Sequence, residues 1–192
     1  FEGLIDKVVW TVDSRSWRKD FYPEADYKGN RKQDSSINWA NFSKTTEEFL
    51  QMLSKQGVII SKTDGAEGDD LMYAWNTESL ANGKSVIMFT GDRDLVQLVN
   101  ETTDIFDMMK ISSTPEAQSK KLLKGVLTKK KVNVVEVDPE EFRFRKVLTG
   151  DAGDNVPPAY WYVSKPQKGN PRRYGISEKK ATEIITEFKD KH

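Results

Sequence analysis

The chain has 192 residues, 31% of them charged and 36% hydrophobic, which is the balance of a globular domain with a large polar surface. It has no cysteine and a single histidine, His192; this composition excludes disulfides, cysteine-ligated zinc and a cysteine nucleophile, and it argues against a histidine general base. The net charge is zero, but basic residues gather at 15–32, 110–131 and 165–180, where they suit either a polyanionic partner or solvated loops.

Hydrophobic periodicity and turn residues predict alternating strands and helices. Short β-branched runs indicate strands, and apolar residues at helical spacing indicate helices. In chain order we expect a strand at 8–12, a helix at 45–55, a strand at 58–60, a helix at 69–80, a strand at 86–89, a short helix at 95–99, strands at 105–106 and 132–137, and helices at 140–148 and 177–189. The alternation indicates a three-layer α/β domain with a mostly parallel, twisted sheet.

The composition changes after residue 149. We expect an α/β core over 1–149, followed by a region over 150–192 in which prolines, glycines, aromatic and basic residues precede the last helix. The chain opens on a strand without an initiator methionine, so we expect that an upstream segment is missing from it.

Carboxylates gather at four places, each at the end of an apolar run. They are Asp13; Glu67, Asp69 and Asp70; Asp92 and Asp94; and Asp151 and Asp154. Asp13 and Asp92 directly follow strands, at the sheet edge where open α/β sheets bind ligands. One such aspartate also suits a helix N-cap, but eight carboxylates in one place repel one another unless cations neutralise them. Hard divalent ions are the usual cations, so the pattern predicts a metal-dependent enzyme acting on a phosphate ester.

Six ordered motifs carry a family resemblance. They are Asp13; Glu67-x-Asp69-Asp70; Gly91-Asp92-Arg93-Asp94; Gly150-Asp151-x-Gly153-Asp154-Asn155; the arch-like segment Trp17 to Arg31; and the hairpin-like segment Gly175 to Ala181. Together they resemble the 5′-nuclease superfamily of flap endonucleases and 5′-3′ exonucleases. Trp39 and the aromatic, basic insert before the hairpin are most similar to the phage ribonuclease H branch. The resemblance implies a PIN-like (Rossmann-like) core, an arch near 17–42 and a C-terminal helix–three-turn–helix element.

The resemblance also implies a reaction and its residues. The chain would use two Mg²⁺ or Mn²⁺ ions to hydrolyse a phosphodiester near a 5′ end. Lys28 and Arg31 would lie at the scissile phosphate. The implied metal ligands are Asp13, Glu67, Asp69, Asp70, Asp92, Asp94, Asp151 and Asp154. The implied DNA-binding residues are Arg18, Lys19, Lys28, Arg31, Gly175, Ser177, Lys179 and Lys180. The hairpin would hold K⁺, although Ser177 also suits an ordinary helix cap.

The implied substrates are branched or nicked DNA and RNA–DNA duplexes with a 5′ end or flap. The resemblance further suggests replication partners, such as a single-strand binding protein or a sliding clamp, and the cytoplasm of a phage-infected bacterium. No apolar run is long enough to span a membrane, so no membrane partner is expected.

Three features depart from the family pattern. The family's first strand, which carries a further essential aspartate, is absent; the usual Gly-Ile-Gly hairpin is Gly175-Ile176-Ser177; and the C-terminal helical region is shortened. Two alternatives therefore stay open. One is a DNA junction-binding module without catalysis, and the other is a PIN-type single-strand ribonuclease, which would lack the hairpin.

Overall fold

The computed structural model describes residues 5–21, 23, 26–106, 126–127, 134–135, 138–159, 161–163 and 173–191. The chain divides into two compact units, Phe1–Trp75 and Asn76–His192, and the division falls within helix α3 (Gly68–Ala81). Each unit is described by itself. No helix in the described ranges is long and apolar enough to cross a membrane.

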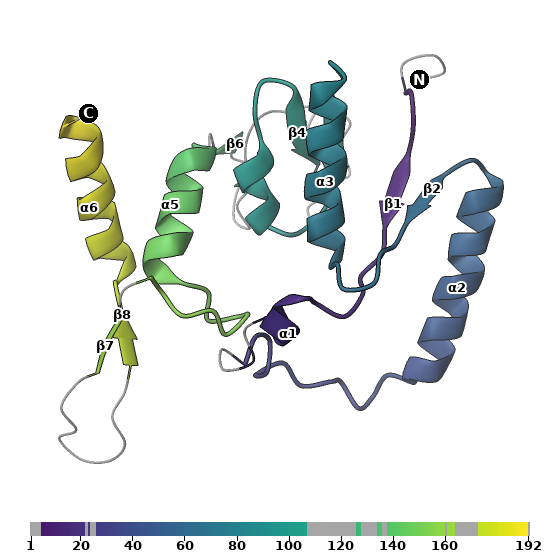
Figure 1. The fold of residues 1–192 in the computed structure, drawn as a ribbon, viewed down its shortest axis with the longest axis horizontal. Helices are drawn as coiled ribbons and strands as arrows, with labels where there is room; N and C mark the ends of the chain where they lie inside the picture. The colour runs from purple at the N-terminus through teal and green to yellow at the C-terminus, as the bar shows by residue number, and fades with distance from the viewer. Residues whose placement is uncertain are drawn as a thin grey trace. The chain divides into compact units, whose positions relative to one another are not determined.

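The first unit is built on a strand–helix–strand connection. Its elements are β1 (Val9–Thr11), α1 (Arg18–Phe21), α2 (Trp39–Lys55), β2 (Ile59–Ser61) and the first turns of α3 (Figure 1). β1 and β2 pair in parallel, with Val9 opposite Ile59, as the alternation of strands and helices predicts, and their side chains are only partly buried. The Trp10 ring meets the Phe49 ring of α2 edge-on at 5.4 Å, so α2 is held against the strand pair.

Helix α2 begins six residues before its predicted start at 45. The Asn38 side chain accepts a hydrogen bond from the Asn41 N–H at 3.1 Å, which satisfies one of the unpaired donors of the first turn. Asparagine is a good cap, and the polar stretch that follows Trp39 hides the helical period of the first turns. The predicted end is confirmed: Gly57 has φ +85°, the left-handed conformation that closes a helix.

The second unit carries the other parallel pair. Its elements are β3 (Val86–Phe89), the 3₁₀ helix η2 (Asp94–Leu98), β4 (Thr103–Phe106), β5 (Val126–Leu127), β6 (Val134–Val135), α5 (Pro139–Thr149), β7 (Trp161–Val163), β8 (Arg173–Gly175) and α6 (Glu178–Lys191) (Figure 1). β3 and β4 are parallel, with Val86 opposite Thr103, whereas β5–β6 and β7–β8 are antiparallel. The described strands thus form four two-stranded ladders, and the expected three-layer arrangement around one mostly parallel sheet stays a prediction.

Apolar residues of β3, η2 and β4 form the core of this unit. The buried side chains are Met88, Leu95, Val96, Val99 and Ile105. Thr103 is fully buried among them and donates a hydrogen bond from Oγ1 to Oδ1 of the buried Asn76, at 2.8 Å. This contact joins the last turns of α3 to β4 through a polar pair whose two members are both buried.

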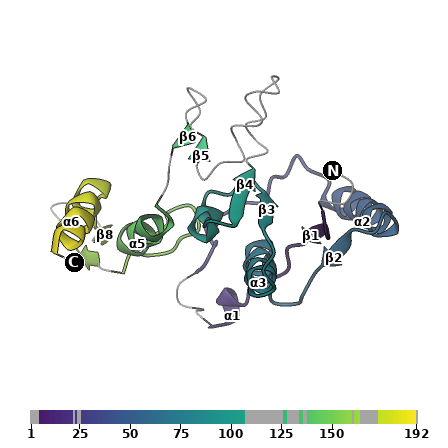
Figure 2. The ribbon, with the colours of Figure 1, turned by 90° about the horizontal axis from the view of Figure 1, so that it is seen from above.

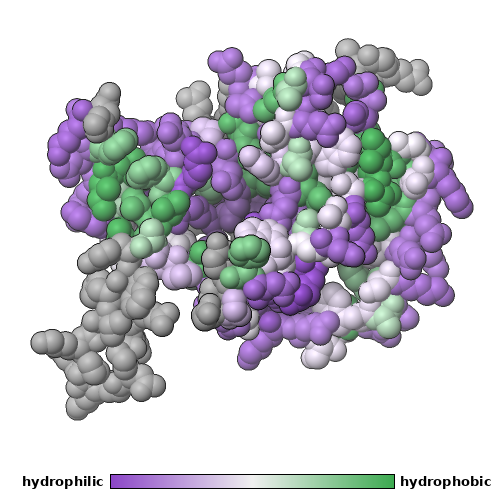
Figure 3. Space-filling model, viewed as in Figure 1, coloured by the Kyte–Doolittle hydropathy of each residue, from purple (hydrophilic) through white to green (hydrophobic). Residues whose placement is uncertain are grey.

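Helices α5 and α6 lie side by side (Figures 1 and 2), with Ala181 and Ile185 buried. The rings of Phe144 and Phe188 stack at 5.8 Å, and each remains about half exposed. The space-filling view shows apolar surface over this helix pair (Figure 3). Both helices are confirmed within one or two residues of their predicted bounds, and Pro139 occupies the first turn of α5 as expected.

We expect Thr103→Val to destabilise the second unit by about 1–3 kcal/mol, because it leaves the buried Asn76 carbonyl without this donor. Thr102→Val is the matched control, since Thr102 is exposed, and it should change stability by less than about 0.5 kcal/mol. Urea unfolding of both variants measures the difference. Equal stabilities would show that the Asn76–Thr103 pair has no special role.

Candidate active-site residues

The first acidic group lies where β1 ends and α3 begins. Asp13 follows the strand, and its Oδ1 accepts a hydrogen bond from the Gly68 N–H at 2.6 Å. A side chain at position 68 would bring its Cβ to 3.0 Å from that oxygen, so glycine permits the close approach. Asp70 reaches back to the Glu67 N–H at 3.0 Å, the reciprocal bond of a capping box. Helix capping thus brings Asp13, Glu67 and Asp70 to one helix terminus.

Glu67 is buried and surrounded by donors. Its Oε2 accepts hydrogen bonds from the Ser16 hydroxyl at 2.8 Å, Arg18 Nη1 at 2.9 Å and the Tyr27 hydroxyl at 3.0 Å, while its Oε1 accepts from Lys28 Nζ. Burial alone would raise the pKa of Glu67, but the bonds from Lys28, Ser16 and Tyr27 outweigh it, and the pKa is lowered. Glu67 is therefore a charged carboxylate compensated inside its own unit.

Arg18 connects the two carboxylates. Its guanidinium grips Asp70 with two bonds, 2.8 Å from Oδ1 and 3.0 Å from Oδ2, in addition to its bond to Glu67. It also lies over the rings of Trp17, at 4.8 Å, and Tyr27, at 5.7 Å. Burial would raise the pKa of Asp70, but the Arg18 bond and the Glu67 N–H lower it overall. Arg18, which the sequence predicts to bind DNA, therefore forms ion pairs with Glu67 and Asp70 in this structure.

A strained turn presents Lys28 to Glu67. Asp26 and Lys28 have φ of 49° and 56°, a left-handed conformation that non-glycine residues seldom adopt. Burial raises the pKa of the Tyr27 hydroxyl to about 12, although its bond to Lys28 acts in the opposite direction. Burial would lower the pKa of Lys28, but its hydrogen bond to Glu67 raises it, so the ammonium stays charged.

The second acidic group lies at the end of β3 and the end of α5. Asp92 is exposed, and its Oδ1 accepts a hydrogen bond from the Asp94 N–H at 2.8 Å where η2 begins. Asp151 Oδ1 accepts from the N–H groups of Gly153, at 2.7 Å, and Asp154, at 3.1 Å. The loop is closed by two backbone bonds between Asp151 and Val156, of 2.9 and 2.8 Å. These local bonds orient the carboxylates of Asp92 and Asp151.

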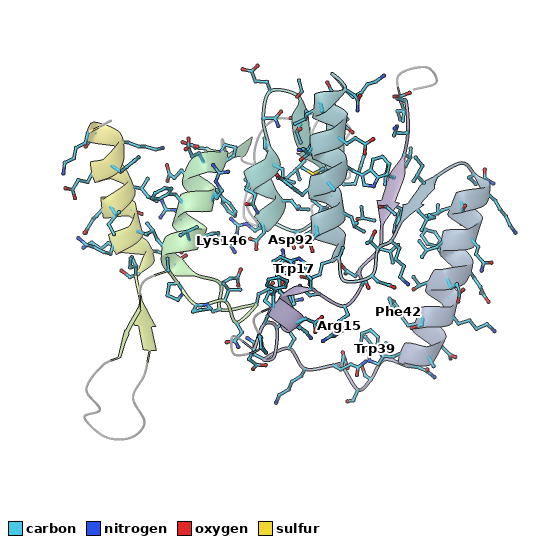
Figure 4. The ribbon with its side chains drawn as sticks, viewed as in Figure 1. Arg15, Trp17, Trp39, Phe42, Asp92 and Lys146 are labelled. Carbon is cyan, nitrogen blue, oxygen red and sulfur yellow. The ribbon has the colours of Figure 1, made fainter. Side chains whose placement is uncertain are left out.

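Lys146 joins two of these carboxylates. It projects from α5 (Figure 4), and its Nζ lies 2.7 Å from Asp94 Oδ1 and 2.5 Å from Asp151 Oδ2. Burial would lower the pKa of Lys146, but the bonds to Asp151 and Asp94 outweigh it, and the pKa is raised. The Lys146 bond in turn lowers the pKa of Asp151. One ammonium group therefore pairs with two carboxylates from distant parts of the second unit.

The eight predicted carboxylates divide equally between the two units, with Asp13, Glu67, Asp69 and Asp70 in one and Asp92, Asp94, Asp151 and Asp154 in the other. Within the described residues, no group of three or more carboxylates is close enough to hold a metal ion. Arg18, Lys28 and Lys146 stand between the carboxylates instead. That all eight meet at one site stays a prediction.

The remaining predicted DNA-binding residues lie at the surface. Lys19 and Arg31 are exposed, and so are Lys179 and Lys180 at the start of α6. The Ser177 hydroxyl accepts a hydrogen bond from the Lys180 N–H at 3.3 Å, so the capping role is present. The expected helix–three-turn–helix hairpin and its K⁺ stay predictions. The lysine-rich segment at 110–131 lies almost wholly outside the described residues, and so does most of the insert at 160–172.

Sequence reasoning missed Ser16, Tyr27 and Lys146. Tyr27 belongs to the arch-like segment Trp17 to Arg31 but was given no role there, and Ser16, between Arg15 and Trp17, belongs to no predicted motif. Lys146 had a usable signal, because it lies five residues before Asp151 in the last turn of a predicted helix, where a basic residue can reach the following loop.

The chain matches the family described as "5'-3' exonuclease, N-terminal resolvase-like domain" over residues 4–139. It is 30% identical over 186 residues to DNA polymerase I of Mycobacterium leprae, which covers 94% of this chain and 17% of the polymerase. It is 25% identical over 182 residues to the 5′-3′ exonuclease of Bacillus subtilis, covering 93% of this chain and 51% of that protein. The chain therefore spans about half or less of these relatives.

Two solved structures share the fold. One is a bacteriophage T5 protein co-crystallised with metal ions, with a TM-score of 0.57, 20% identity, and coverage of 94% of this chain and 60% of that one. The other is the bacteriophage T5 flap endonuclease in a complex with DNA and metal ions, with a TM-score of 0.56 and 19% identity, covering 94% and 59%. The parallel strand pairs and the capped acidic helix thus define a resolvase-like α/β protein. The chain belongs to the 5′-3′ exonuclease family, which confirms the resemblance seen in its motifs.

The charge compensation around Glu67 predicts sensitivity to acid. The pKa values of Glu67 and Asp70 are lower in the folded chain than in the unfolded one, so these carboxylates stabilise the fold above their unfolded pKa of about 4. That contribution is lost as the pH falls through the lowered, folded pKa values. We expect Glu67→Gln to lower the free energy of unfolding at pH 7 by about 1–3 kcal/mol. The variant should also lose less stability than the wild type as the pH falls from about 5 to about 2.

Thermal unfolding in EDTA as a function of pH measures both effects. Glu47→Gln, at an exposed position of α2, is the control and should keep the wild-type profile. If Glu67→Gln follows the wild-type pH profile, the Glu67 cluster does not contribute to stability in the way described.

Proposed function

We propose that the chain is the catalytic part of a metal-dependent 5′-nuclease. It hydrolyses phosphodiester bonds near 5′ ends of branched or nicked DNA and RNA–DNA duplexes, as a 5′-3′ exonuclease and flap endonuclease that removes primers or flaps during replication. The observation that carries the proposal is the placement of four acidic motifs at ends of β1, β3, α3 and α5 in a chain of this family. The T5 flap endonuclease, which shares the fold, was solved with DNA and metal ions.

The residues present fit divalent ions such as Mg²⁺ or Mn²⁺. The two groups offer only carboxylate oxygens, the ligands that hard cations prefer, and in this structure each group is neutralised by positively charged side chains. We propose that Asp13, Glu67, Asp69, Asp70, Asp92, Asp94, Asp151 and Asp154 hold two such ions. When bound, ions of this kind lower the pKa of a water molecule and offset negative charge on the phosphate.

The chain's own cations handle the substrate in this proposal. Lys28 and Arg31 offset charge at the scissile phosphate, and Arg18 and Lys19 hold nearby backbone phosphates. The start of α6, at Gly175, Ser177, Lys179 and Lys180, binds the duplex through backbone N–H groups and lysines, with K⁺ at the preceding hairpin. Lys28 pairs with Glu67 in this structure, so phosphate binding requires it to change partners.

The cellular setting is also part of the proposal. Primer and flap removal implies replication partners, such as a single-strand binding protein or a sliding clamp, in the cytoplasm of a bacterial cell. The likeness to the phage ribonuclease H branch extends this to an infected host. These partners and this location rest on the relatives, DNA polymerases and 5′-3′ exonucleases, of which the chain spans only a part.

Replacement of two carboxylates tests the function. Asp92→Asn combined with Asp94→Asn should lower the rate of cleavage of a 5′-flap DNA by at least about 100-fold in Mg²⁺, because both positions lose the charge that attracts the ions. Binding of the same DNA should change little. The measurement is gel-resolved cleavage with Mg²⁺ and with EDTA, beside a binding titration.

Asp190→Asn, an exposed carboxylate on α6, is the matched control and should cut at the wild-type rate. Undiminished cleavage by the double variant would contradict the ligand assignment. Wild-type protein that binds the flap without ion-dependent cleavage would favour an inert junction-binding module, and cleavage of single-stranded RNA alone would favour a PIN-type ribonuclease.

A further inference from the structure

Lys146 lies between two carboxylates that come from different parts of the second unit. Asp94 begins η2, and Asp151 follows α5, more than fifty residues later in the chain. The Lys146 ammonium is within hydrogen-bond distance of both, 2.7 Å from Asp94 and 2.5 Å from Asp151. The side chain is 37% exposed, so the ammonium can leave this position without unfolding the helix that carries it.

The Asp151 carboxylate is held in place by other bonds as well as by Lys146. Asp151 Oδ1 is engaged with the N–H groups of Gly153 and Asp154, which leaves Oδ2 directed at Lys146. The Asp94 backbone is held by Asp92. At position 150 a side chain would bring its Cβ within 2.6 Å of the backbone at Pro158, so the glycine there, with φ +71°, permits this loop shape. Asp151 Oδ2 therefore faces a cation position that does not depend on Lys146 alone, and Asp94 Oδ1 faces the same position from the start of η2.

A second lysine in the same unit shows what is particular to Lys146. Lys189 also bridges two carboxylates, Asp138 at 2.8 Å and Glu141 at 2.9 Å. That bridge joins the end of α6 to the start of α5, and neither partner belongs to an acidic motif. Both partners of Lys146 are among the proposed ion ligands.

We propose that Lys146 is an internal cation that competes with divalent ions for Asp94 and Asp151. Without an ion, it neutralises two carboxylates that would otherwise repel each other. A divalent ion brings more charge to the same oxygens, and it binds only by displacing the ammonium, so part of its binding free energy is spent on breaking two ion pairs. The inference rests on the proposed function, because it takes these carboxylates as ion ligands.

The direction in which Lys146→Met changes the affinity for Mn²⁺ separates this role from a merely structural one. If Lys146 competes with the ion, Lys146→Met should bind Mn²⁺ about three- to tenfold more tightly than the wild-type chain, the gain expected from removing two partly exposed ion pairs. If Lys146 only holds the site in shape, the same change should weaken binding. The full chain is titrated with Mn²⁺ alone, and free Mn²⁺ is followed by its electron paramagnetic resonance signal.

Lys189→Met is the matched control, since it removes an equivalent bridge, and it should leave Mn²⁺ affinity unchanged. The unfolding temperature gives a second readout: Lys146→Met should be less stable in EDTA and should gain more from Mn²⁺ than the wild type does. Lys146→Gln, which keeps a polar side chain, decides the question if Lys146→Met does not fold.

The outcomes also distinguish this inference from the function on which it rests. Unchanged or weaker Mn²⁺ binding by the Lys146 variants overturns the inference alone, provided that the wild type binds Mn²⁺ and Asp151→Asn weakens that binding. A wild-type chain that binds no Mn²⁺ contradicts both the inference and the metal-dependent function.

Discussion

Carboxylates that converge on one place repel one another, and both units of this chain balance that repulsion with basic side chains of their own. In the first unit Arg18 and Lys28 neutralise Glu67 and Asp70, and in the second Lys146 neutralises Asp94 and Asp151. The arrangement lets acidic motifs gather at strand ends and helix starts without an ion to hold them. It also explains why the pKa values of Glu67, Asp70 and Asp151 are low although burial acts to raise them.

The same compensation defines the state from which the proposed reaction starts, in which carboxylates of the acidic motifs are paired with basic side chains. Under the proposed function, Arg18, Lys28 and Lys146 pair with carboxylates proposed to hold the ions, so binding would exchange one set of partners for another rather than fill an empty site. Such an exchange costs less than exposing unpaired buried charges. The strained turn around Lys28, with left-handed residues on both sides of Tyr27, agrees with a segment that changes partners during function. Membership of the 5′-3′ exonuclease family supplies the context, because its relatives include a DNA polymerase I and a 5′-3′ exonuclease.

Local rules predicted most elements of the fold. The strands at β1, β2 and β3 and the helices α3, α5 and α6 lie within one or two residues of their expected bounds, because β-branched runs, caps, Pro139 and Gly57 act through near neighbours. The start of α2 was wrong by six residues, since a single cap at Asn38 decides it against a polar first turn. The expected helix at 95–99 is a 3₁₀ helix displaced by one residue, and the Asp94 N–H at its start donates a hydrogen bond to Asp92. β4 begins earlier than expected, because the buried Thr103 is polar and pairs with Asn76.

The sequence by itself determined the family, the alternating α/β character and the identity of the acidic residues, because motif order, periodicity and capping are written in neighbouring residues. The tertiary structure alone decided which cation meets a carboxylate distant from it in the chain. Lys28 and Glu67 are 39 residues apart in the chain, and Lys146 and Asp94 are 52 residues apart. No local pattern encodes such pairs, because they form only when helices and loops distant in the chain pack together and the charges minimise their repulsion.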